Sequence, residues 1–407
     1  MKIAVISIGD ELLKGTIENK NLAVIGQELR KIGLIPSLQV TIKDFKDDIN
    51  ECLNYLDSNF DIIISTGGLG PTDDDITVKA FSEHYGLKLY EDKNVISHIQ
   101  NILKQNNRTI SKYSLKQAMV PTGCTIIDNF NGTAPGILFE YKNQKIFLLP
   151  GPPHEMKPMI SNYIIPYIES NFKFNKTYFN SVYAVNFPES EIQKTVSDKI
   201  KSHKDINIAY RVTCGVCEIT FSSRNKKLAD KYASDFKKIM GNSLLSNNTD
   251  SLFEETVHLL QKQNITFSTA ESCTAGMIGS HITDISGVSS IYKGGVIAYS
   301  NKIKEHILGV KASVLEKHGA VSKECAEEMV KCICGKFNTD AGISVTGIAG
   351  PDGGTEEKPV GLVYIAVKLY DKIKIKKYNF TGNRSMVRQR TASSAVNLLR
   401  EICLDHF

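Results

Sequence analysis

The sequence predicts an α/β protein built on parallel sheets that helices cover on both faces. From Met1 to about Ile168, short apolar segments alternate with amphipathic ones, a pattern typical of strands and helices in a parallel sheet. Glycine-rich loops follow several of the expected strands, where ligands of such sheets bind. At 407 residues the chain exceeds one hydrophobic core. We expect three domains, over residues 1–170, 171–248 and 249–407.

Composition and cysteine usage predict a globular protein with reduced thiols, as in a cytoplasm. Hydrophobic residues make up 42% of the chain and charged residues 23%, which is ordinary for globular proteins. The net charge of +5 is mild and spread out, which argues against nucleic acid as a partner. Nine irregularly spaced cysteines fit reduced thiols. We find neither a secretory signal nor a run long enough to span a membrane.

The expected N-terminal domain is a parallel-sheet unit with two loops that suit phosphate binding. Two apolar runs predict buried strands and two periodic segments predict helices: Ile3–Ile8, Ile62–Ser65, Leu22–Leu29 and Ile49–Leu56. The loops Gly9–Gly15 and Gly67–Asp75 follow the strands. Their glycines let backbone approach a phosphate, while their carboxylates would repel it unless a divalent cation intervenes. The alternative is that Asp73–Asp75 only cap a helix beginning near Ile76.

The middle segment predicts a small α+β unit without a ligand site. Four segments alternate between strand and helix patterns: Ser181–Val185, Glu189–Ile200, Val216–Phe221 and Lys227–Met240. Cys214 and Cys217 have CxxC spacing but no second Cys or His pair to complete a zinc site. We interpret the unit as a spacer or dimerisation domain. Ser246–Asp250 reads as a polar linker to the next domain.

The C-terminal domain begins with an amphipathic helix and contains three predicted strands. The helix covers Leu252–Lys262, the strands cover Ile265–Thr269, Ala341–Val345 and Leu362–Val367, and a closing helix runs from about Asn383 to Leu399. After the first strand, Glu271–Gly276 forms a turn of small residues before a helix. Such a turn presents N–H groups at the positive end of a helix dipole and exposes a hydroxyl. Ser272 is thus either a nucleophile or a helix N-cap.

A serine becomes a nucleophile only beside a base. The histidines of this domain, His281, His306 and His318, lie in helix-like stretches without a carboxylate pair. A basic turn, Tyr299–Lys304, follows another strand-like segment, Gly295–Ala298. A lysine desolvated there would lose its proton near neutral pH and serve as the base. The alternative is a surface lysine.

Two further features suggest a bound anion. The loop Thr346–Gly354 follows a strand and is dense in glycine, which suits close backbone approach to a ligand. Arg384 and Arg388 are four residues apart, so a helix would place both on one face as a phosphate fork. An ordinary surface loop and solvated arginines are the alternatives.

Six motifs of this domain resemble the C-terminal domain of the competence/damage-inducible protein A (CinA) family. In order they are Thr269–Thr274, Tyr299–Asn301, Leu308–Val310, Gly319–Ser322, Thr346–Pro351 and Lys358–Gly361. The family domain is similar to nicotinamide mononucleotide deamidase, an amidohydrolase that needs no cofactor. The resemblance implies Ser272 as nucleophile, with Tyr299 and Lys304 as its activating partners. It also implies substrate contacts from Thr274, Gly276, Thr346, Gly347, Ala349, Gly350, Arg384 and Arg388.

Two positions depart from that family pattern. Ala275 stands where the family usually has a second glycine, so the turn could be narrower. Asn383 stands where the family usually has Asp before Arg384. Asparagine keeps a capping side chain but carries no charge.

The N-terminal motifs carry a second resemblance. Thr66–Gly68 with Asp74 resembles the molybdopterin-binding fold, and together with Asn131–Gly136 and Leu149–Met156 it resembles the CinA N-terminal domain. Similar domains are metal-dependent ADP-ribose pyrophosphatases. The resemblance implies phosphate contacts from Gly67, Gly68 and Gly70, and a divalent metal held by Glu11, Asp74, Asp75 and Glu155.

We therefore expect a homodimeric, bifunctional pyridine-nucleotide salvage enzyme. Its C-terminal domain would deamidate nicotinamide mononucleotide, and its N-terminal domain would hydrolyse ADP-ribose to AMP and ribose 5-phosphate. One alternative is a non-catalytic nucleotide-binding adaptor in competence or DNA recombination. The other is a molybdopterin-binding protein, which rests on fold analogy alone.

Overall fold

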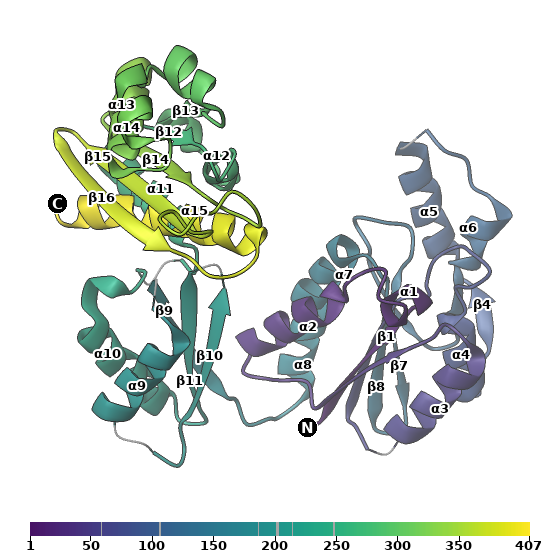
Figure 1. Cartoon of the computed structure of the whole chain (residues 1–407). Coiled ribbons are helices and arrows are strands. Elements are labelled where there is room, and N and C mark those ends of the chain that lie inside the picture. The colour runs from purple at the N-terminus through teal and green to yellow at the C-terminus, as the bar shows by residue number, and fades with distance from the viewer. Residues whose placement is uncertain (58, 106, 186, 201–202, 214, 247–248) are drawn as a thin grey trace. The chain divides into compact units, whose positions relative to one another are not determined.

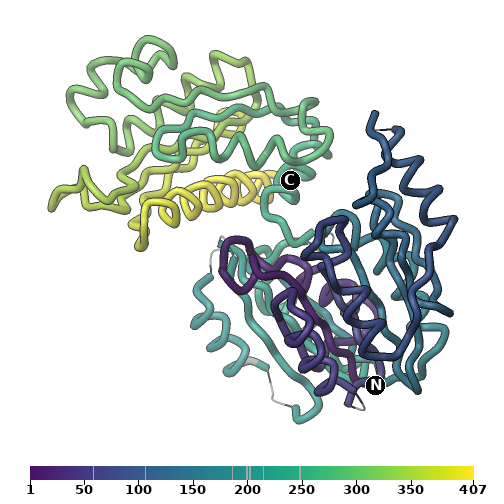
Figure 2. The backbone as a smooth tube through the Cα atoms, turned by 90° about the vertical axis from the view of Figure 1, so that its right-hand side faces the viewer, coloured from purple at the N-terminus to yellow at the C-terminus, as the bar shows by residue number. Residues whose placement is uncertain are grey.

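A computed structural model describes residues 1–57, 59–105, 107–185, 187–200, 203–213, 215–246 and 249–407. These residues form two compact units, Met1–Tyr178 and Phe179–Phe407, whose chain paths can be followed in Figures 1 and 2. The predicted division into three domains stays a prediction. Cys214 of the CxxC pair and Asn247–Asn248 of the predicted linker lie outside the described residues.

The first unit is built on a six-stranded sheet in the order β2-β1-β3-β8-β7-β6. Strands β2 (Leu38–Ile42), β1 (Ile3–Ile8), β3 (Ile62–Thr66) and β8 (Gln144–Leu149) run parallel, as predicted. Strands β7 (Gly136–Tyr141) and β6 (Thr125–Ile127) are antiparallel. This reversal was not predicted from the sequence. Only Lys142 and Asn143 join β7 to β8, and a link that short makes a hairpin and not a parallel crossover.

Helices cover both faces of this sheet, and alternate residues of β1 enter the two cores. Ile3 and Val5 pack with α2 (Lys20–Lys31), α7 (Pro153–Met159), the π-helix η1 (Ile160–Ile164) and α8 (Ile165–Asn171). Ala4 and Ile6 pack with α3 (Lys46–Leu56) and α4 (Thr77–His84). This alternation follows from the two-residue period of a strand. Figure 1 also labels the outlying elements α1 (Asp10–Leu13), β4 (Leu89–Glu91), α5 (Lys93–Gln105) and α6 (Lys112–Lys116). Strand β5 (Met119–Pro121) pairs with β4.

The second unit begins with a three-stranded sheet in the order β10-β11-β9. Its strands are β9 (Tyr178–Val185), β10 (Asn207–Thr213) and β11 (Val216–Ser223), and β10 and β11 are antiparallel. Two helices accompany them, α9 (Glu189–Lys199) and α10 (Lys226–Met240), and a short 3₁₀ turn η2 (Gly241–Ser243) follows. The α+β character predicted for this segment is confirmed.

The rest of the second unit has a five-stranded sheet in the order β13-β12-β14-β15-β16. Strands β13 (Tyr292–Ile297), β12 (Phe267–Glu271) and β14 (Ala341–Gly347) are parallel, whereas β15 (Leu362–Leu369) and β16 (Lys372–Asn379) are antiparallel. One core holds α14 (Lys323–Phe337), beside which α13 (Ala312–His318) lies. The opposite core holds α11 (Leu252–Lys262), α12 (Met277–Thr283) and α15 (Arg384–Leu404), the last being the long yellow helix of Figure 2.

A buried arginine ties the two parts of this unit together. Arg400 is 3% exposed. Its Nη1 donates to the Asn242 carbonyl at 3.0 Å, its Nη2 donates to the Leu244 carbonyl at 2.5 Å, and its Nε contacts Glu255. Val185 and Leu245 also pack in the core of the five-stranded part. The middle segment therefore shares a core with the C-terminal one.

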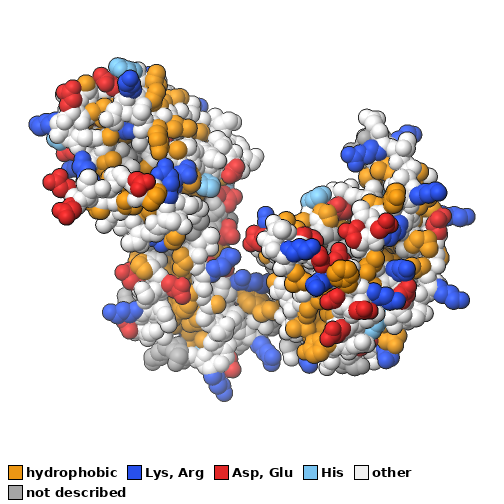
Figure 3. All heavy atoms as spheres, turned by 45° about the vertical axis from the view of Figure 1, so that its right-hand side comes forward, with side chains coloured by type: hydrophobic (Ala, Val, Ile, Leu, Met, Phe, Trp, Pro, Cys, Tyr) orange, Lys and Arg blue, Asp and Glu red, His pale blue; other side chains and the backbone are white. Residues whose placement is uncertain are grey.

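No helix among the described residues is long and apolar enough to cross a membrane. On the face shown in Figure 3, lysine and arginine side chains are interspersed with aspartate and glutamate.

Candidate functional sites

Ser272 occupies a tight turn at the end of β12 in the second unit. Its backbone N–H donates to the Val345 carbonyl at 3.0 Å, which continues the pairing of β12 with β14. The helix α12 begins only at Met277, and its N-cap residue is Gly276, with φ of 88°. Ser272 is therefore not the helix cap considered as the alternative. Ser272 is 8% exposed, and its hydroxyl contacts a side chain from another element.

That partner is the amine of Lys304. The short π-helix η4 (Ile303–Leu308) carries Lys304, whose Nζ lies 3.0 Å from Ser272 Oγ. The same amine donates to the Ala298 carbonyl at 2.7 Å and to the Tyr299 carbonyl at 3.4 Å. Lys304 is only 1% exposed. The structure thus brings together the two residues that sequence reasoning paired.

The surroundings of Lys304 favour its neutral form. Burial lowers the pKa of Lys304 below its usual value of 10.5, because desolvation penalises the ammonium. Its three acceptors, one hydroxyl and two carbonyls, carry no formal charge. Burial also raises the pKa of the neighbouring thiols, Cys273 to about 12 and Cys325 to about 11. Both thiols are then protonated at neutral pH and are poor nucleophiles.

The Tyr299 hydroxyl does not lie between Lys304 and Ser272, where it would have to be to relay a proton. Its ring is in a residue 58% exposed, and its hydroxyl accepts a hydrogen bond from Arg384 Nη2 at 3.1 Å. Only its backbone carbonyl contacts Lys304. Lys304 reaches Ser272 directly, so proton transfer needs no phenol between them.

The two arginines of the expected phosphate fork diverge. Arg384 Nη1 donates to the Gly350 carbonyl at 2.7 Å, whereas Arg388 Nη2 donates to the Thr274 carbonyl at 2.8 Å. The fork is therefore not formed, because each guanidinium is held by a different loop. Arg388 supports the Ser272 turn, and Arg384 stands at the cavity.

A cavity of about 180 Å³ opens over Ser272 and Lys304. Of the predicted substrate contacts it includes Thr346, Gly347, Ala349 and Arg384, whereas Thr274, Gly276, Gly350 and Arg388 are not among the residues that line it. Sequence reasoning did not single out Asn301, Ala320 or Val321, which also line it. All three residues belong to the motifs Tyr299–Asn301 and Gly319–Ser322, which could have identified them as cavity residues.

The N-terminus of α12 is not open to an anion, contrary to expectation. The Glu271 carboxylate already accepts hydrogen bonds from Ile278 N at 3.1 Å and Gly279 N at 2.9 Å. A negative side chain thus satisfies the free N–H groups of the helix start. Within the turn, the N–H groups of Cys273 and Thr274 have no backbone carbonyl partner among the described residues, and both interact with the Cys273 sulfur.

A larger cavity, of about 840 Å³, lies in the first unit at the carboxyl ends of β1, β3 and β8. Gly67, Gly68 and Gly70 line it, as predicted. Side chains at Gly67 and Gly68 are excluded, because a Cβ would lie 2.1 Å from the Ile8 carbonyl in one case and 2.1 Å from Thr77 Oγ1 in the other. The loop therefore presents bare backbone to the cavity.

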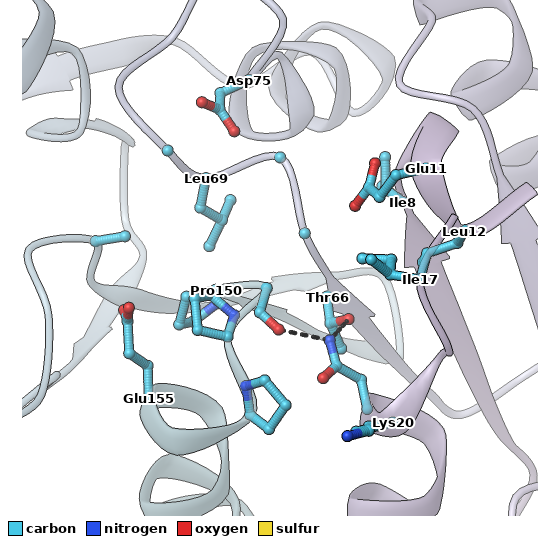
Figure 4. A pocket seen from close by; sticks show the side chains of 18 of the residues that line it. Ile8, Glu11, Leu12, Ile17, Lys20, Thr66, Leu69, Asp75, Pro150 and Glu155 are labelled. Atoms are coloured by element: carbon cyan, nitrogen blue, oxygen red, sulfur yellow. Dashed lines mark hydrogen bonds between the residues drawn. The ribbon is translucent and has the colours of Figure 1, made fainter. Parts of the chain in front are cut away.

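Asn21 stabilises the floor of this cavity. This role was not predicted from the sequence. Its Nδ2 donates to Thr66 Oγ1 at 2.9 Å and to the Gly151 carbonyl at 2.7 Å, the dashed lines of Figure 4. An asparagine within a helical pattern gives no local signal, because its partners are 45 and 130 residues away in the chain.

The predicted metal ligands do not converge. Glu11, Asp75 and Glu155 line the cavity, whereas Asp74 does not, and Figure 4 shows Glu155 across the cavity from Glu11. Asp75 Oδ2 accepts from Thr72 N at 2.9 Å, and Glu155 Oε2 accepts from Asn129 Nδ2 at 2.7 Å. Among the described residues no three His, Cys, Asp or Glu side chains gather as a metal site. These carboxylates do not fit a preformed metal cage, and we derive no chemical step through a metal.

The alternative role of the acidic residues also fails. Helix α4 has Ile76 as its N-cap, with no side-chain cap hydrogen bond. Asp75 instead closes a local turn by binding the backbone N–H and hydroxyl of Thr72. The acidic run therefore shapes the loop and does not cap the helix.

Comparison with known families and proteins covers most of the chain. The family described as CinA C-terminal domain matches residues 249–403, and the family described as probable molybdopterin binding domain matches residues 4–170. A CinA-like protein of Kosmotoga olearia is 37% identical over 411 residues, covering 99% of both chains. A CinA-like protein of Dictyoglomus thermophilum is 35% identical over 406 residues, covering 98% of both. A crystal structure of the protein CinA from Thermoplasma acidophilum is 32% identical, covers 42% of this chain and 98% of its own, and has a TM-score of 0.38.

Proposed function

This chain belongs to the CinA family, and we propose that its C-terminal site hydrolyses the carboxamide of nicotinamide mononucleotide to nicotinate mononucleotide and ammonia. The observation that carries the proposal is the buried Lys304 amine, 3.0 Å from Ser272 Oγ. A neutral amine beside a serine hydroxyl is a base that activates the serine as a nucleophile for acyl transfer.

The reaction proceeds through an acyl-enzyme. Neutral Lys304 takes the Ser272 proton as Oγ attacks the carboxamide carbon, and the resulting ammonium returns a proton to the leaving nitrogen. Ammonia departs and leaves the nicotinoyl group as an ester on Ser272. Water, deprotonated by Lys304, then cleaves the ester and releases the acid.

As Ser272 attacks, negative charge develops on the substrate oxygen. Hydrogen-bond donors at fixed positions in the fold must stabilise that charge. The N–H groups of Cys273 and Thr274 fill this role in our proposal, and each such donor typically contributes about 3 kcal/mol. The 180 Å³ cavity takes the pyridine carboxamide. Arg384, at its edge, supplies the positive charge for the 5′-phosphate.

Ammonia release from nicotinamide mononucleotide by the full chain tests the proposal. We expect Ser272→Ala and Lys304→Met to lower kcat by about 10³-fold or more, as losing a nucleophile or its base does. Ser280→Ala and Lys302→Met are matched controls at exposed neighbouring positions and should retain activity. Ammonia release at the wild-type rate by Ser272→Ala would rule out the serine mechanism.

As a second activity, we propose that the first unit hydrolyses ADP-ribose to AMP and ribose 5-phosphate. Its support is the 840 Å³ cavity at the strand ends, walled by the bare backbone of Gly67 and Gly68. A volume of this order suits a whole nucleotide ligand. Because the carboxylates are not gathered, any divalent metal would be held largely by the substrate phosphates.

The second activity is tested by AMP release from ADP-ribose, with and without EDTA. We expect release by wild type and by Ser272→Ala alike, and its loss in EDTA. Undiminished release in EDTA would show that the hydrolysis needs no divalent metal. Nucleotide binding without any product, at either site, would favour the non-catalytic adaptor.

A further inference from the structure

The residue before the nucleophile, Glu271, carries a buried carboxylate that the proposed reaction does not use. Glu271 is 2% exposed and ends strand β12. Neighbouring side chains of a strand lie on opposite faces of a sheet, so Glu271 contacts α12 on one face, whereas Ser272 contacts Lys304 on the other. Burying a carboxylate costs free energy unless hydrogen bonds compensate. The partners of this carboxylate therefore indicate its role.

The hydrogen bonds of Glu271 close the nucleophile turn into a ring. Its carboxylate accepts from Ile278 N at 3.1 Å and from Gly279 N at 2.9 Å, both in the first turn of α12. The chain leaves the sheet at Glu271, passes through Ser272–Gly276 and then returns to the Glu271 side chain. One carboxylate thus holds the two ends of the turn together.

The turn needs restraint because its backbone is strained. Ala275 has φ of 51° and Gly276 has φ of 88°, so two consecutive residues lie in the left-handed region, which is unfavourable for a residue with a Cβ. Strained backbone persists only where the surrounding structure over-determines it. Arg388 of α15 supplies a second restraint, because its Nη2 donates to the Thr274 carbonyl at 2.8 Å.

The N–H groups of Cys273 and Thr274, the donors of the proposed oxyanion site, lie between these two restraints. Both interact with the Cys273 sulfur, a weak acceptor that a developing oxyanion would replace. Such donors contribute to catalysis only when they lie about 2.7–3.1 Å from the position of the oxyanion. A small rotation of the turn would therefore remove their effect.

We propose that Glu271 and Arg388 are positioning residues for acyl transfer, which hold the Ser272–Gly276 turn so that its N–H groups meet the substrate oxygen in the transition state. The inference rests on the proposed nucleophilic role of Ser272. Neither Glu271 nor Arg388 is among the residues that line the cavity. Binding of the substrate before the reaction should therefore not depend on them.

Steady-state deamidation by the full chain separates positioning from substrate binding. We expect Glu271→Gln and Arg388→Met to lower kcat for nicotinamide mononucleotide by about tenfold or more, with KM unchanged, because the lost interaction acts only in the transition state. Glutamine keeps the size of Glu271, but its NH2 group would face one of the two backbone N–H groups, donor against donor. Methionine removes the donor to the Thr274 carbonyl.

Two matched controls change the same chemical groups elsewhere in this unit. Asp340→Asn alters a carboxylate that accepts from Thr266 N at 2.9 Å, next to the opposite end of β12. Arg390→Met alters an arginine of α15 that donates to the Thr381 carbonyl at 2.6 Å. Both controls should keep the wild-type kcat and KM. Losses of kcat as large as those at Glu271 and Arg388 would reveal general destabilisation and overturn the positioning role.

A second readout needs no nicotinamide mononucleotide. Phenylmethylsulfonyl fluoride sulfonylates an activated serine: the Ser272 oxygen bonds to sulfur, fluoride leaves, and Lys304 takes the proton. Negative charge develops on the sulfonyl oxygens, so the same N–H donors assist. Mass spectrometry measures the rate. We expect Glu271→Gln and Arg388→Met to be labelled about tenfold or more slowly than wild type, and Ser272→Ala not to be labelled.

The outcomes separate this inference from the proposed deamidation. Slow labelling of both variants, in a protein whose wild type is labelled but releases no ammonia, supports the positioning role and overturns the proposed substrate. Wild-type kcat and labelling rates in folded Glu271→Gln and Arg388→Met overturn the positioning role alone. A raised KM with unchanged kcat also overturns it, because it shows a role in substrate binding. A wild type that is neither labelled nor active overturns both proposals. Should Glu271→Gln not fold, Arg388→Met still decides, since Arg388 is only half-buried.

Discussion

The amine of Lys304 acts as a base only in its neutral form, and its surroundings decide how much of that form exists. Sequence reasoning paired Lys304 with Ser272 through a family resemblance, but it could not show that the pair touches. The contact spans 32 residues of chain and depends on the turn after β12 meeting the helix after β13. Arg388 shows the opposite case, since its partner, the Thr274 carbonyl 114 residues away, left no local pattern to read.

The lowered pKa of Lys304 predicts a pH profile for deamidation. Burial shifts this pKa below 10.5, so the neutral base accumulates as pH rises through the lowered value. We expect kcat/KM to rise through one ionisation in that region and then level off, as general-base catalysis requires. Steady-state rates from pH 6 to about 10 measure this rise in kcat/KM. The upper end of the range lies near the usual lysine pKa.

Variants identify the group behind that ionisation. Lys302→Met should leave the profile unchanged. Lys304→Arg should be inactive throughout, because a guanidinium is not deprotonated in proteins. A flat profile, or one that rises only near the ordinary lysine pKa, would show that Lys304 is not a desolvated base.

Ala275 carries a second prediction at this scale. Its φ is 51°, in the left-handed region that costs a residue with a Cβ about 1–2 kcal/mol, and this is the position where the family usually has glycine. Ala275→Gly should therefore raise the free energy of unfolding, by about 0.5–1 kcal/mol after the entropy lost by glycine. Urea unfolding measures the change.

Ala312→Gly is the control for this effect. Ala312 is exposed in the first turn of α13, with helical backbone, so glycine there should destabilise by up to about 1 kcal/mol. Opposite signs for the two substitutions are expected. Destabilisation of similar size at both positions would contradict the strain assigned to Ala275.

Among the elements, strongly periodic helices and buried strands were predictable, and irregular ones were not. The helix Leu252–Lys262 matches its prediction residue for residue, because its apolar face and its Ser251 cap are both local signals. The π-helix η4 (Ile303–Leu308) had no such signal, yet it carries Lys304. The antiparallel strands β7, β15 and β16 depend on pairing between segments, which periodicity within one segment does not report.

The glycine loop after β3 allows a prediction that separates strain from collision. Gly68 and Gly86 have nearly equal φ values, 66° and 67°, so alanine costs the same backbone strain at either. A Cβ at Gly68 would lie 2.1 Å from Thr77 Oγ1, whereas one at Gly86 meets nothing within 4 Å. Gly86→Ala should cost about 1–2 kcal/mol of unfolding free energy.

Gly68→Ala should cost clearly more, because Thr77 would also lose its hydrogen bond to the Gly67 carbonyl, 2.9 Å long. We also expect it to weaken AMP binding, which Gly86→Ala should leave intact. Urea unfolding and calorimetry measure the two effects. Equal stability losses in the two variants would mean that the loop relaxes around the new methyl group.

At the scale of the whole molecule, composition and length predicted several domains but not how the middle segment is attached. The predicted boundary near residue 249 rests on a polar sequence. The structure nevertheless joins the segments on its two sides, through Arg400 and through Val185 and Leu245 in the shared core. The side chain of Arg400 lies more than 150 residues along the chain from its acceptors, the carbonyls of Asn242 and Leu244. A local sequence pattern does not report so distant a contact.

This attachment predicts how two fragments will differ. A fragment of residues 249–407 contains Ser272, Lys304 and the whole small cavity, and its size is ordinary for a domain. We expect it to fold and to deamidate. It lacks both carbonyl acceptors of Arg400, and hydrogen bonds from a charged group contribute about 1.5–3 kcal/mol each. Its unfolding free energy should therefore fall by about 3 kcal/mol relative to a fragment of residues 179–407.

Urea unfolding and ammonia release on both fragments test this, with Arg400→Met as the diagnostic variant. In the longer fragment the substitution should destabilise, because it leaves the Asn242 and Leu244 carbonyls and Glu255 without their donor. In the shorter fragment only Glu255 loses a partner, so the loss should be smaller. Equal losses would show that the middle segment is not held through Arg400. A folded but inactive shorter fragment would show that residues before 249 complete the active site.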